Sequence, residues 1–113
     1  MNCLFCNIIN KKIPSKIVYE DKHVFAFEDI NPQAPVHVLI VPKKHIATVL
    51  ETTPGDNELI GYLFQIANRI AKDRGIAERG FRLVMNCNPE AGQTVYHIHL
   101  HLLAGRPMHW PPG

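Results

Sequence analysis

The sequence predicts a mixed fold in which short β-strands are combined with one long α-helix. Two observations point to it: brief runs of β-branched and aromatic residues lie between turn residues, and one stretch after Thr53 carries an apolar residue at each helical turn. At 113 residues the chain is large enough for one hydrophobic core and too small for two. We therefore expect a single domain over residues 1–113, ending in a proline-rich tail at 105–113.

The chain opens with two cysteines, Cys3 and Cys6, separated by two residues. This spacing suits two thiolate ligands of one tetrahedral zinc ion, and it equally suits a redox pair or two ordinary cysteines in a short amphipathic helix. The redox role ranks below packing, because no βαβ pattern follows. Three cysteines, Cys87 included, cannot all pair internally and do not predict a secreted disulfide framework.

Residues 16–20 and 23–28 are β-rich runs on either side of Asp21-Lys22, and they predict a hairpin. The prolines of the segment 29–35 exclude a central strand there, so we expect a turn. Asp29, where the second run ends, is either a turn cap or a carboxylate that accepts two vicinal hydroxyls.

Residues 36–41 are apolar on both faces and predict a buried central strand that carries His37. A lone buried histidine is usually a hydrogen-bonded core residue. His45, after the strand, would by itself pass as a surface residue. Its meaning depends on what lies beside it in the fold.

The long helix is expected to begin near Thr53 and to end near Gly75. Thr53 is a capping residue, Pro54 suits the first helical position, and Asp56 suits the positive end of the helix dipole. One face at helical spacing is apolar and predicts core or a dimer interface; it comprises Leu59, Ile60, Leu63, Phe64, Ala67, Ile70 and Ala71.

The last third of the chain predicts a strand at 80–86, a loop at 88–94 and a second strand at 96–103. In that second strand His97, His99 and His101 would share one face, because successive side chains alternate. The tail carries the only tryptophan, Trp110, whose apolar surface needs cover from the body of the protein or from another subunit.

Three chemistries are open for this row of histidines. A three-histidine catalytic zinc site is strained, because the first and third residues lie roughly 14 Å apart along a strand. Covalent catalysis would use a neutral imidazole as nucleophile, and the reference pKa of about 6.5 leaves histidine largely neutral near pH 7. In the third case the histidines bind zinc for stability only, and the protein is an interaction module.

Composition excludes other classes of function. A formal charge of +2 without a basic stripe does not predict nucleic-acid binding. The N-terminal residues lack a charged leader, and the apolar runs are far shorter than a membrane span. We therefore expect a cytoplasmic protein with no nucleic-acid or membrane partner.

Residues 97–103 resemble the histidine-triad (HIT) family, whose pattern is His-x-His-x-His followed by two apolar residues. Residues 27–37, 42–45, 92–96 and 105–113 are similar to the Hint branch of that family, so the resemblance covers nearly the whole chain. It implies an α+β fold: a five-stranded, mainly antiparallel sheet with one long helix and a short N-terminal helix. It also implies a homodimer that joins the sheets and long helices of two subunits.

The activity implied by the resemblance is hydrolysis of purine nucleoside 5′-phosphoramidates. His99 matches the nucleophile that attacks the α-phosphorus, expels the amine and becomes a nucleotidyl-histidine that water clears. His101 and His37 match its phosphate-contacting and hydrogen-bonding companions. The alternatives are a zinc-stabilised nucleotide-binding regulatory module and a dinucleotide polyphosphate hydrolase of another HIT branch, and the ending 108–113 argues against the latter.

The resemblance also implies the residues that bind the nucleotide. Asp29 matches the acid that holds the ribose hydroxyls, and Asn86, Gly92 and Thr94 match residues around the phosphate. The apolar slot for the base corresponds to Leu4, Phe5, Ile8, Phe27 and Ile30. Two positions depart from the family: Thr94, counted among the catalytic groups, replaces a common serine and adds a methyl group, and Ala91 stands where a second glycine is frequent.

HIT proteins with an N-terminal Cys-x-x-Cys are similar in binding one structural zinc ion. Their ligands are the two cysteines, the histidine after the lysine pair and the first triad histidine. In this sequence those positions are Cys3, Cys6, His45 and His97, a closed Cys₂His₂ set. His99 is not a ligand in this arrangement, so no metal is needed for catalysis.

Overall fold

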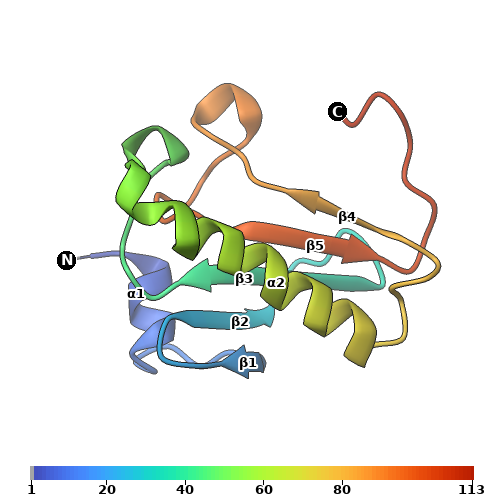
Figure 1. Ribbon diagram of the computed structural model, residues 1–113, viewed down its shortest axis with the longest axis horizontal. Coiled ribbons are helices and arrows are strands. Elements are labelled where there is room, and N and C mark those ends of the chain that lie inside the picture. Colours follow the sequence, from blue (N-terminus) through green and yellow to red (C-terminus); the bar gives the residue numbers. More distant parts are fainter. Residues whose placement is uncertain (1) are drawn as a thin grey trace.

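The computed structural model describes residues 2–113, which form a five-stranded antiparallel sheet with a helix on each face (Figure 1). The strand order is β1-β2-β3-β5-β4, and every neighbouring pair is antiparallel. The strands are β1 (Ile17–Glu20), β2 (Val24–Glu28), β3 (Val36–Pro42), β4 (Phe81–Val84) and β5 (Leu100–Ala104). The helices are α1 (Leu4–Ile9) and α2 (Asn57–Asp73). The expected α+β architecture is confirmed.

Strand residues alternate between two apolar clusters, one under each helix. The long helix α2 covers Val38 and Ile40 of β3 together with Leu100 and Leu102 of β5. On the opposite face, Leu39 and Val41 pack with the short helix α1. This two-sided packing explains why β3 is apolar at every position except His37, and it confirms the predicted buried central strand.

The predicted end of the long helix near Gly75 is confirmed, whereas the α-helix begins at Asn57, later than the predicted start near Thr53. A single 3-10 turn, Pro54–Asp56, precedes it, and the carboxylate of Asp56 accepts a hydrogen bond of 2.9 Å from the amide of Thr53. Gly75 follows it with a φ of +71°, a conformation that glycine adopts at little cost.

The buried face of α2 differs from the prediction at Phe64 and Ile66. Phe64 is 41% exposed, whereas Ile66 is buried beside Leu63, Ala67 and Ile70. Residues 63, 66, 67 and 70 lie on one side of a helix, and Phe64 is turned about 100° away from Leu63. The prediction of Phe64 as core was therefore wrong, and the dimer-interface alternative remains for it.

The predicted strand over residues 96–103 was wrong at its beginning, because β5 starts only at Leu100. Its last pair with β3 joins Leu100 to Ile40, two residues before the end of β3. Beyond that pair the amide of Ile98 donates to the carbonyl of Ile46 at 2.8 Å, and Pro42 has no amide hydrogen to offer. The first two histidines of the row therefore lie outside the sheet, and His97 lies in a bend.

The hairpin of β1 and β2 is confirmed to within one residue at each strand, and β4 is shorter than predicted, four residues instead of seven.

The tail forms neither helix nor strand, as its prolines predicted. Trp110 is 83% exposed, so the body of the chain does not cover it. Within residues 2–113, no helix has the length and apolarity needed to cross a membrane.

Candidate functional site

The four residues predicted as zinc ligands lie together at one end of the sheet. Cys3 caps the N-terminus of α1 and Cys6 lies in its first turn; His45 follows β3, and His97 precedes β5. All four ligand atoms lie within 4.8 Å of one another. Cys3 and His97 are buried, and Cys6 and His45 are half-buried, so the cluster is largely closed to solvent.

The spacing of these atoms fits a tetrahedral zinc ion. Zinc bonds of about 2.3 Å to sulfur and 2.0–2.1 Å to nitrogen give tetrahedral edges of about 3.3 Å between nitrogens and about 3.6 Å between nitrogen and sulfur. The two Nδ1 atoms of His45 and His97 are 3.2 Å apart. The His97 Nδ1 lies 3.6 Å from each sulfur, and the His45 Nδ1 lies 3.5 Å from that of Cys6.

A backbone group orients the His97 ring for metal binding. Its Nε2–H donates to the carbonyl of Pro42 at 2.7 Å, which leaves the lone pair of Nδ1 directed at the other three ligand atoms. Burial raises the pKa of the Cys6 thiol, and the neighbouring Cys3 raises it further. Two thiolates at this place need a cation beside them, as a Cys₂His₂ zinc site supplies.

His99 has one ring nitrogen free for chemistry. Its Nδ1–H donates to the carbonyl of His97 at 2.8 Å, so Nε2 carries the lone pair. The Phe5 ring packs against it in a T-shaped arrangement, with 5.0 Å between the ring centroids. Burial lowers the pKa of His99, although the hydrogen bond to His97 opposes the shift. The imidazole is therefore neutral and nucleophilic at pH 7.

His37 and His101 form a hydrogen-bonded relay beside His99. The backbone amide of Gln33 donates to Nδ1 of His37 at 3.0 Å, so the proton of this neutral ring lies on Nε2. That Nε2–H faces Nδ1 of His101 at 2.9 Å and the carboxylate of Asp29 at 3.4 Å. His101 accepts at Nδ1, and its own proton therefore lies on Nε2.

Burial keeps both rings of the relay neutral. It lowers the pKa of His37, opposed by the charge of Asp29. It also lowers the pKa of His101 to about 4, assisted by the neighbouring rings of His99 and His37. The ring centroids of His99 and His101 are 4.9 Å apart, so a group held by one ring also lies within reach of the other.

Asp29, His37 and His101 place their polar atoms within 4.8 Å of one another, which raises the question of a second metal ion. The protonation of His37 argues against it. Because Nδ1 of His37 accepts from the Gln33 amide, Nε2 carries a hydrogen and has no lone pair for a metal. The cluster is a hydrogen-bond relay.

The residues predicted to bind the nucleoside divide between surface and core. One carboxylate oxygen of Asp29 accepts from the amide of Asn31 at 2.8 Å, and the side chain remains 20% exposed. Ile30 is 97% exposed and Leu4 47% exposed. Phe5, Ile8 and Phe27 are buried in the cluster under α1. Their roles toward a base stay predictions.

The predicted loop 88–94, which carries Gly92 and Thr94, is held by a residue that sequence analysis missed. Gln93 is only 4% exposed; its side-chain oxygen accepts from the amide of Asn88 at 2.8 Å, and its amide donates to the carbonyl of Ala47 at 2.8 Å. A glutamine in a polar loop gives no sign in the sequence that it is buried. The backbone amide of Gln33 was also missed, because the role of a backbone group does not depend on the side chain that the sequence specifies.

Comparison with known proteins places these observations among close relatives. A family model described as HIT domain matches residues 10–108. The chain is 50% identical over 105 residues to a purine nucleoside phosphoramidase of Escherichia coli, covering 93% of this chain and 88% of that protein. It is 50% identical over 112 residues to a 14 kDa zinc-binding protein of Zea mays, covering 97% and 87%. A crystal structure of a HIT family hydrolase from Legionella pneumophila superimposes with a TM-score of 0.98 at 54% identity, over 99% of this chain and 100% of that one.

Proposed function

The chain belongs to the HIT family, and on that premise we propose that it hydrolyses the P–N bond of purine nucleoside 5′-phosphoramidates through a covalent intermediate on His99. The observation that carries the proposal is the fixed tautomer of His99. Its Nδ1–H is held by the His97 carbonyl, so the Nε2 lone pair is free to attack phosphorus. Support for the substrate class comes from the 50% identity to the bacterial phosphoramidase.

In the first step Nε2 of His99 forms a bond to the α-phosphorus, and the electron pair of the P–N bond leaves with the amine, which takes a proton from water. The positive charge that develops on the imidazole is stabilised by the hydrogen bond from Nδ1–H to the His97 carbonyl. In the second step water attacks phosphorus, and the P–Nε2 bond breaks with its electron pair returning to His99. The proton that this water loses neutralises the hydroxide left by the first step, and the nucleoside monophosphate is released.

His101 and His37 assist the same transfer. Because His37 donates to Nδ1 of His101, the Nε2–H of His101 is presented as a donor to a phosphoryl oxygen. Asp29 accepts hydrogen bonds from the ribose hydroxyls, and Asn86, together with Gly92 and Thr94 of the loop that follows it, surrounds the phosphate. The exposed side chains of Leu4 and Ile30 contact the base.

Cys3, Cys6, His45 and His97 hold a structural zinc ion in this proposal, which the geometry of the donor set and the 50% identity to a zinc-binding relative support. The ion supplies cross-linking and no chemistry to the reaction. His97 serves both parts: its ring is a ligand and its carbonyl orients His99. We also propose that the protein is a homodimer, as the family resemblance implies.

Release of amine and adenosine monophosphate from adenosine 5′-phosphoramidate tests the proposal. The parent protein should turn over, and His99→Ala should lose at least about 1,000-fold in kcat/KM, because the nucleophile is gone. His109→Ala, an exposed histidine of the tail, serves as the matched control. A slow substrate should leave a nucleotidyl group on His99 that mass spectrometry detects.

If His99→Ala retains the parent rate, the covalent mechanism is wrong. If the parent binds the mononucleotide tightly but neither turns over nor traps a covalent adduct, the protein is a nucleotide-binding module instead.

A further inference from the structure

The backbone of Gln33 connects the tail of the protein to the histidine relay. Its carbonyl accepts two hydrogen bonds from the guanidinium of Arg106, from Nε and from Nη2, each at 3.1 Å. Its amide donates to Nδ1 of His37 at 3.0 Å. The carbonyl of Gln33 is therefore held by Arg106, while the amide of the same residue sets the tautomer of His37.

A second contact fixes the same loop from the same side. Gly105, next to Arg106, has a φ of +93°, and a Cβ atom built on it would lie 2.8 Å from Cβ of Pro35. The tail therefore packs against the segment 29–35 so closely that only glycine fits. Within that segment the amide of Asn31 donates to Asp29 and the Gln33 side chain donates to the Asn31 carbonyl, so hydrogen bonds connect the residues of the loop to one another.

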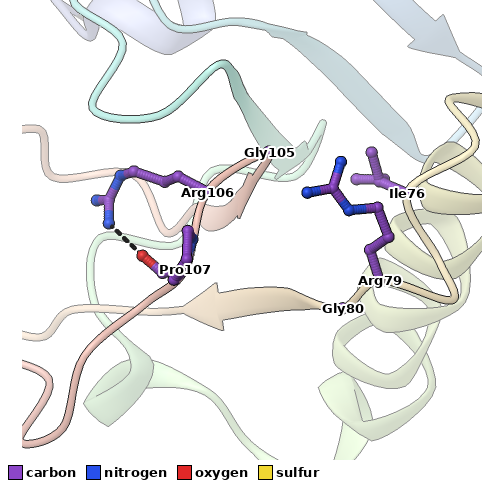
Figure 2. A pocket seen from close by; sticks show the side chains of 6 residues that line it. All are labelled: Ile76, Arg79, Gly80, Gly105, Arg106 and Pro107. Atoms are coloured by element: carbon purple, nitrogen blue, oxygen red, sulfur yellow. Dashed lines mark hydrogen bonds between the residues drawn. The ribbon is translucent and has the colours of Figure 1, made fainter.

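The position of the Arg106 side chain argues against a simpler role as an anion site. Arg106 and Arg79 line the same cavity of about 240 Å³. Their guanidinium groups lie apart, however, with that of Arg106 beside the carbonyl of Pro107 (Figure 2). The three nitrogens of Arg106 are all engaged with carbonyls of Gln33 and Pro107, and they are not directed at a common point with Arg79.

We propose that Arg106 is a positioning residue for the reaction: it holds the loop 29–35 so that the Gln33 amide meets Nδ1 of His37. This contact keeps the His37 proton on Nε2, and the relay then keeps the His101 proton on the Nε2 that faces the substrate. The fork of an arginine is suited to this task, because it bonds one carbonyl through two nitrogens and so fixes a direction. The expected effect on kcat rests on the proposed function, whereas the expected effect on the His37 tautomer rests only on the contacts of Arg106 and Gln33.

The test compares Arg106→Gln and Arg106→Lys with Arg82→Gln. Arg82 is a matched control, since it also donates to a tail carbonyl, that of His109 at 2.9 Å, without contacting the loop 29–35. The tautomer of His37 is followed by the ¹⁵N chemical shifts of its ring nitrogens, and kcat and KM are measured with adenosine 5′-phosphoramidate.

Arg106→Gln should shift His37 toward a mixture of Nδ1–H and Nε2–H forms and lower kcat about tenfold with KM changed less than about twofold, because misplacing the relay affects the transition state more than binding. Arg106→Lys should change the His37 tautomer and kcat less than Arg106→Gln does. Arg82→Gln should leave both unchanged, and all variants should unfold near the parent temperature.

Two results would overturn the inference: an unchanged His37 tautomer in Arg106→Gln, or an equal change in Arg82→Gln. Gly105→Ala gives an independent check, since its methyl group would displace Pro35 and should produce the same ¹⁵N signature. Should the parent protein lack phosphoramidase activity while the tautomer still shifts in Arg106→Gln, the positioning contact stands and the proposed function fails.

Discussion

The histidines His37, His97 and His99 each bond one ring nitrogen to a backbone group and leave the other for chemistry. The partners are the Gln33 amide and the carbonyls of Pro42 and His97. Side-chain partners of this kind would appear in a sequence as acidic or polar residues, whereas backbone partners leave no mark. The carboxylate that contacts these rings is that of Asp29, 3.4 Å from Nε2 of His37.

The relay predicts an acid-resistant His101. Protonation would place a hydrogen on Nδ1, where the His37 ring already donates, and burial holds the pKa of His101 at about 4 against an ordinary 6.5. An NMR titration of the ring protons should therefore give a midpoint near pH 4, with the signal assigned by its loss in His101→Gln. A midpoint near 6.5 would show that the ring is not desolvated.

The lowered pKa of His101 also predicts how the stability of the protein depends on pH. Between pH 6.5 and 4 the unfolded chain binds a proton at His101 that the native chain excludes. The contribution of this group to stability is thus fully present above pH 6.5 and is lost as the pH falls through 4. Urea unfolding at pH 7 and pH 5 should show a lower free energy of unfolding at pH 5, and His101→Gln should reduce that difference.

At the scale of elements, the helix and hairpin were predictable because their signals are local. Thr53, Pro54 and Gly75 mark the ends of α2 through their own backbone chemistry. The start of β5 was not predictable, because it depends on where β3 stops pairing and on a contact from Ile98 to Ile46 across the chain. The prediction of Phe64 as a core residue failed for a related reason. Helical spacing identifies an apolar face of the helix, but it does not show which edge of that face contacts the sheet.

One carboxylate joins α2 to the β1–β2 hairpin. Oδ2 of Asp21 accepts from the hydroxyls of Tyr19 and Tyr62, and Oδ1 accepts from the amides of His23 and Val24 at 2.8 Å each. Burial raises the pKa of Asp21, but these hydrogen bonds outweigh burial and lower the pKa to about 2.

Asp21→Asn should lower the free energy of unfolding by about 1–3 kcal/mol, because an amide offers one acceptor oxygen where the carboxylate offers two. Urea titration at pH 7 measures the loss. Tyr62→Phe removes one donor only and should cost less. Phosphoramidase activity of the folded protein should stay at the parent level in both variants. A loss of activity under conditions where the variant is fully folded would link the hairpin to the site.

At the scale of the molecule, the proposed zinc ion joins three parts of the chain that are distant in sequence: α1, the segment after β3 and the segment before β5. We predict one zinc ion per chain by elemental analysis of the purified protein. Stripping it with a chelator should lower the unfolding temperature by about 15–20 °C, since a ligand present at a thousand times its Kd adds about 4 kcal/mol to the stability of a domain of this size.

Cys6→Ser should lose the zinc, whereas Cys87→Ser should keep it, because Cys87 is not part of the Cys₂His₂ cluster. Zinc content that is equal in the two variants would contradict the assignment of the ligands. Activity of the stripped protein is informative as well: it should fall only as far as folding is lost, because the ion takes no part in the displacement.

The last prediction concerns association of two chains. The outer strand β4 pairs on one side only, with β5, and Phe64 exposes 41% of its surface on α2. An unpaired strand edge and an exposed aromatic side chain are features that a second subunit would cover. Phe64→Glu should place a charge in that contact and raise the dimer Kd at least about 30-fold, measured by sedimentation equilibrium. Gln65→Glu adds the same charge one residue along, where α2 lines a pocket together with His23, and should leave the dimer intact. A parent protein that sediments as a monomer, or two variants that weaken the dimer equally, would rule out this face of the helix.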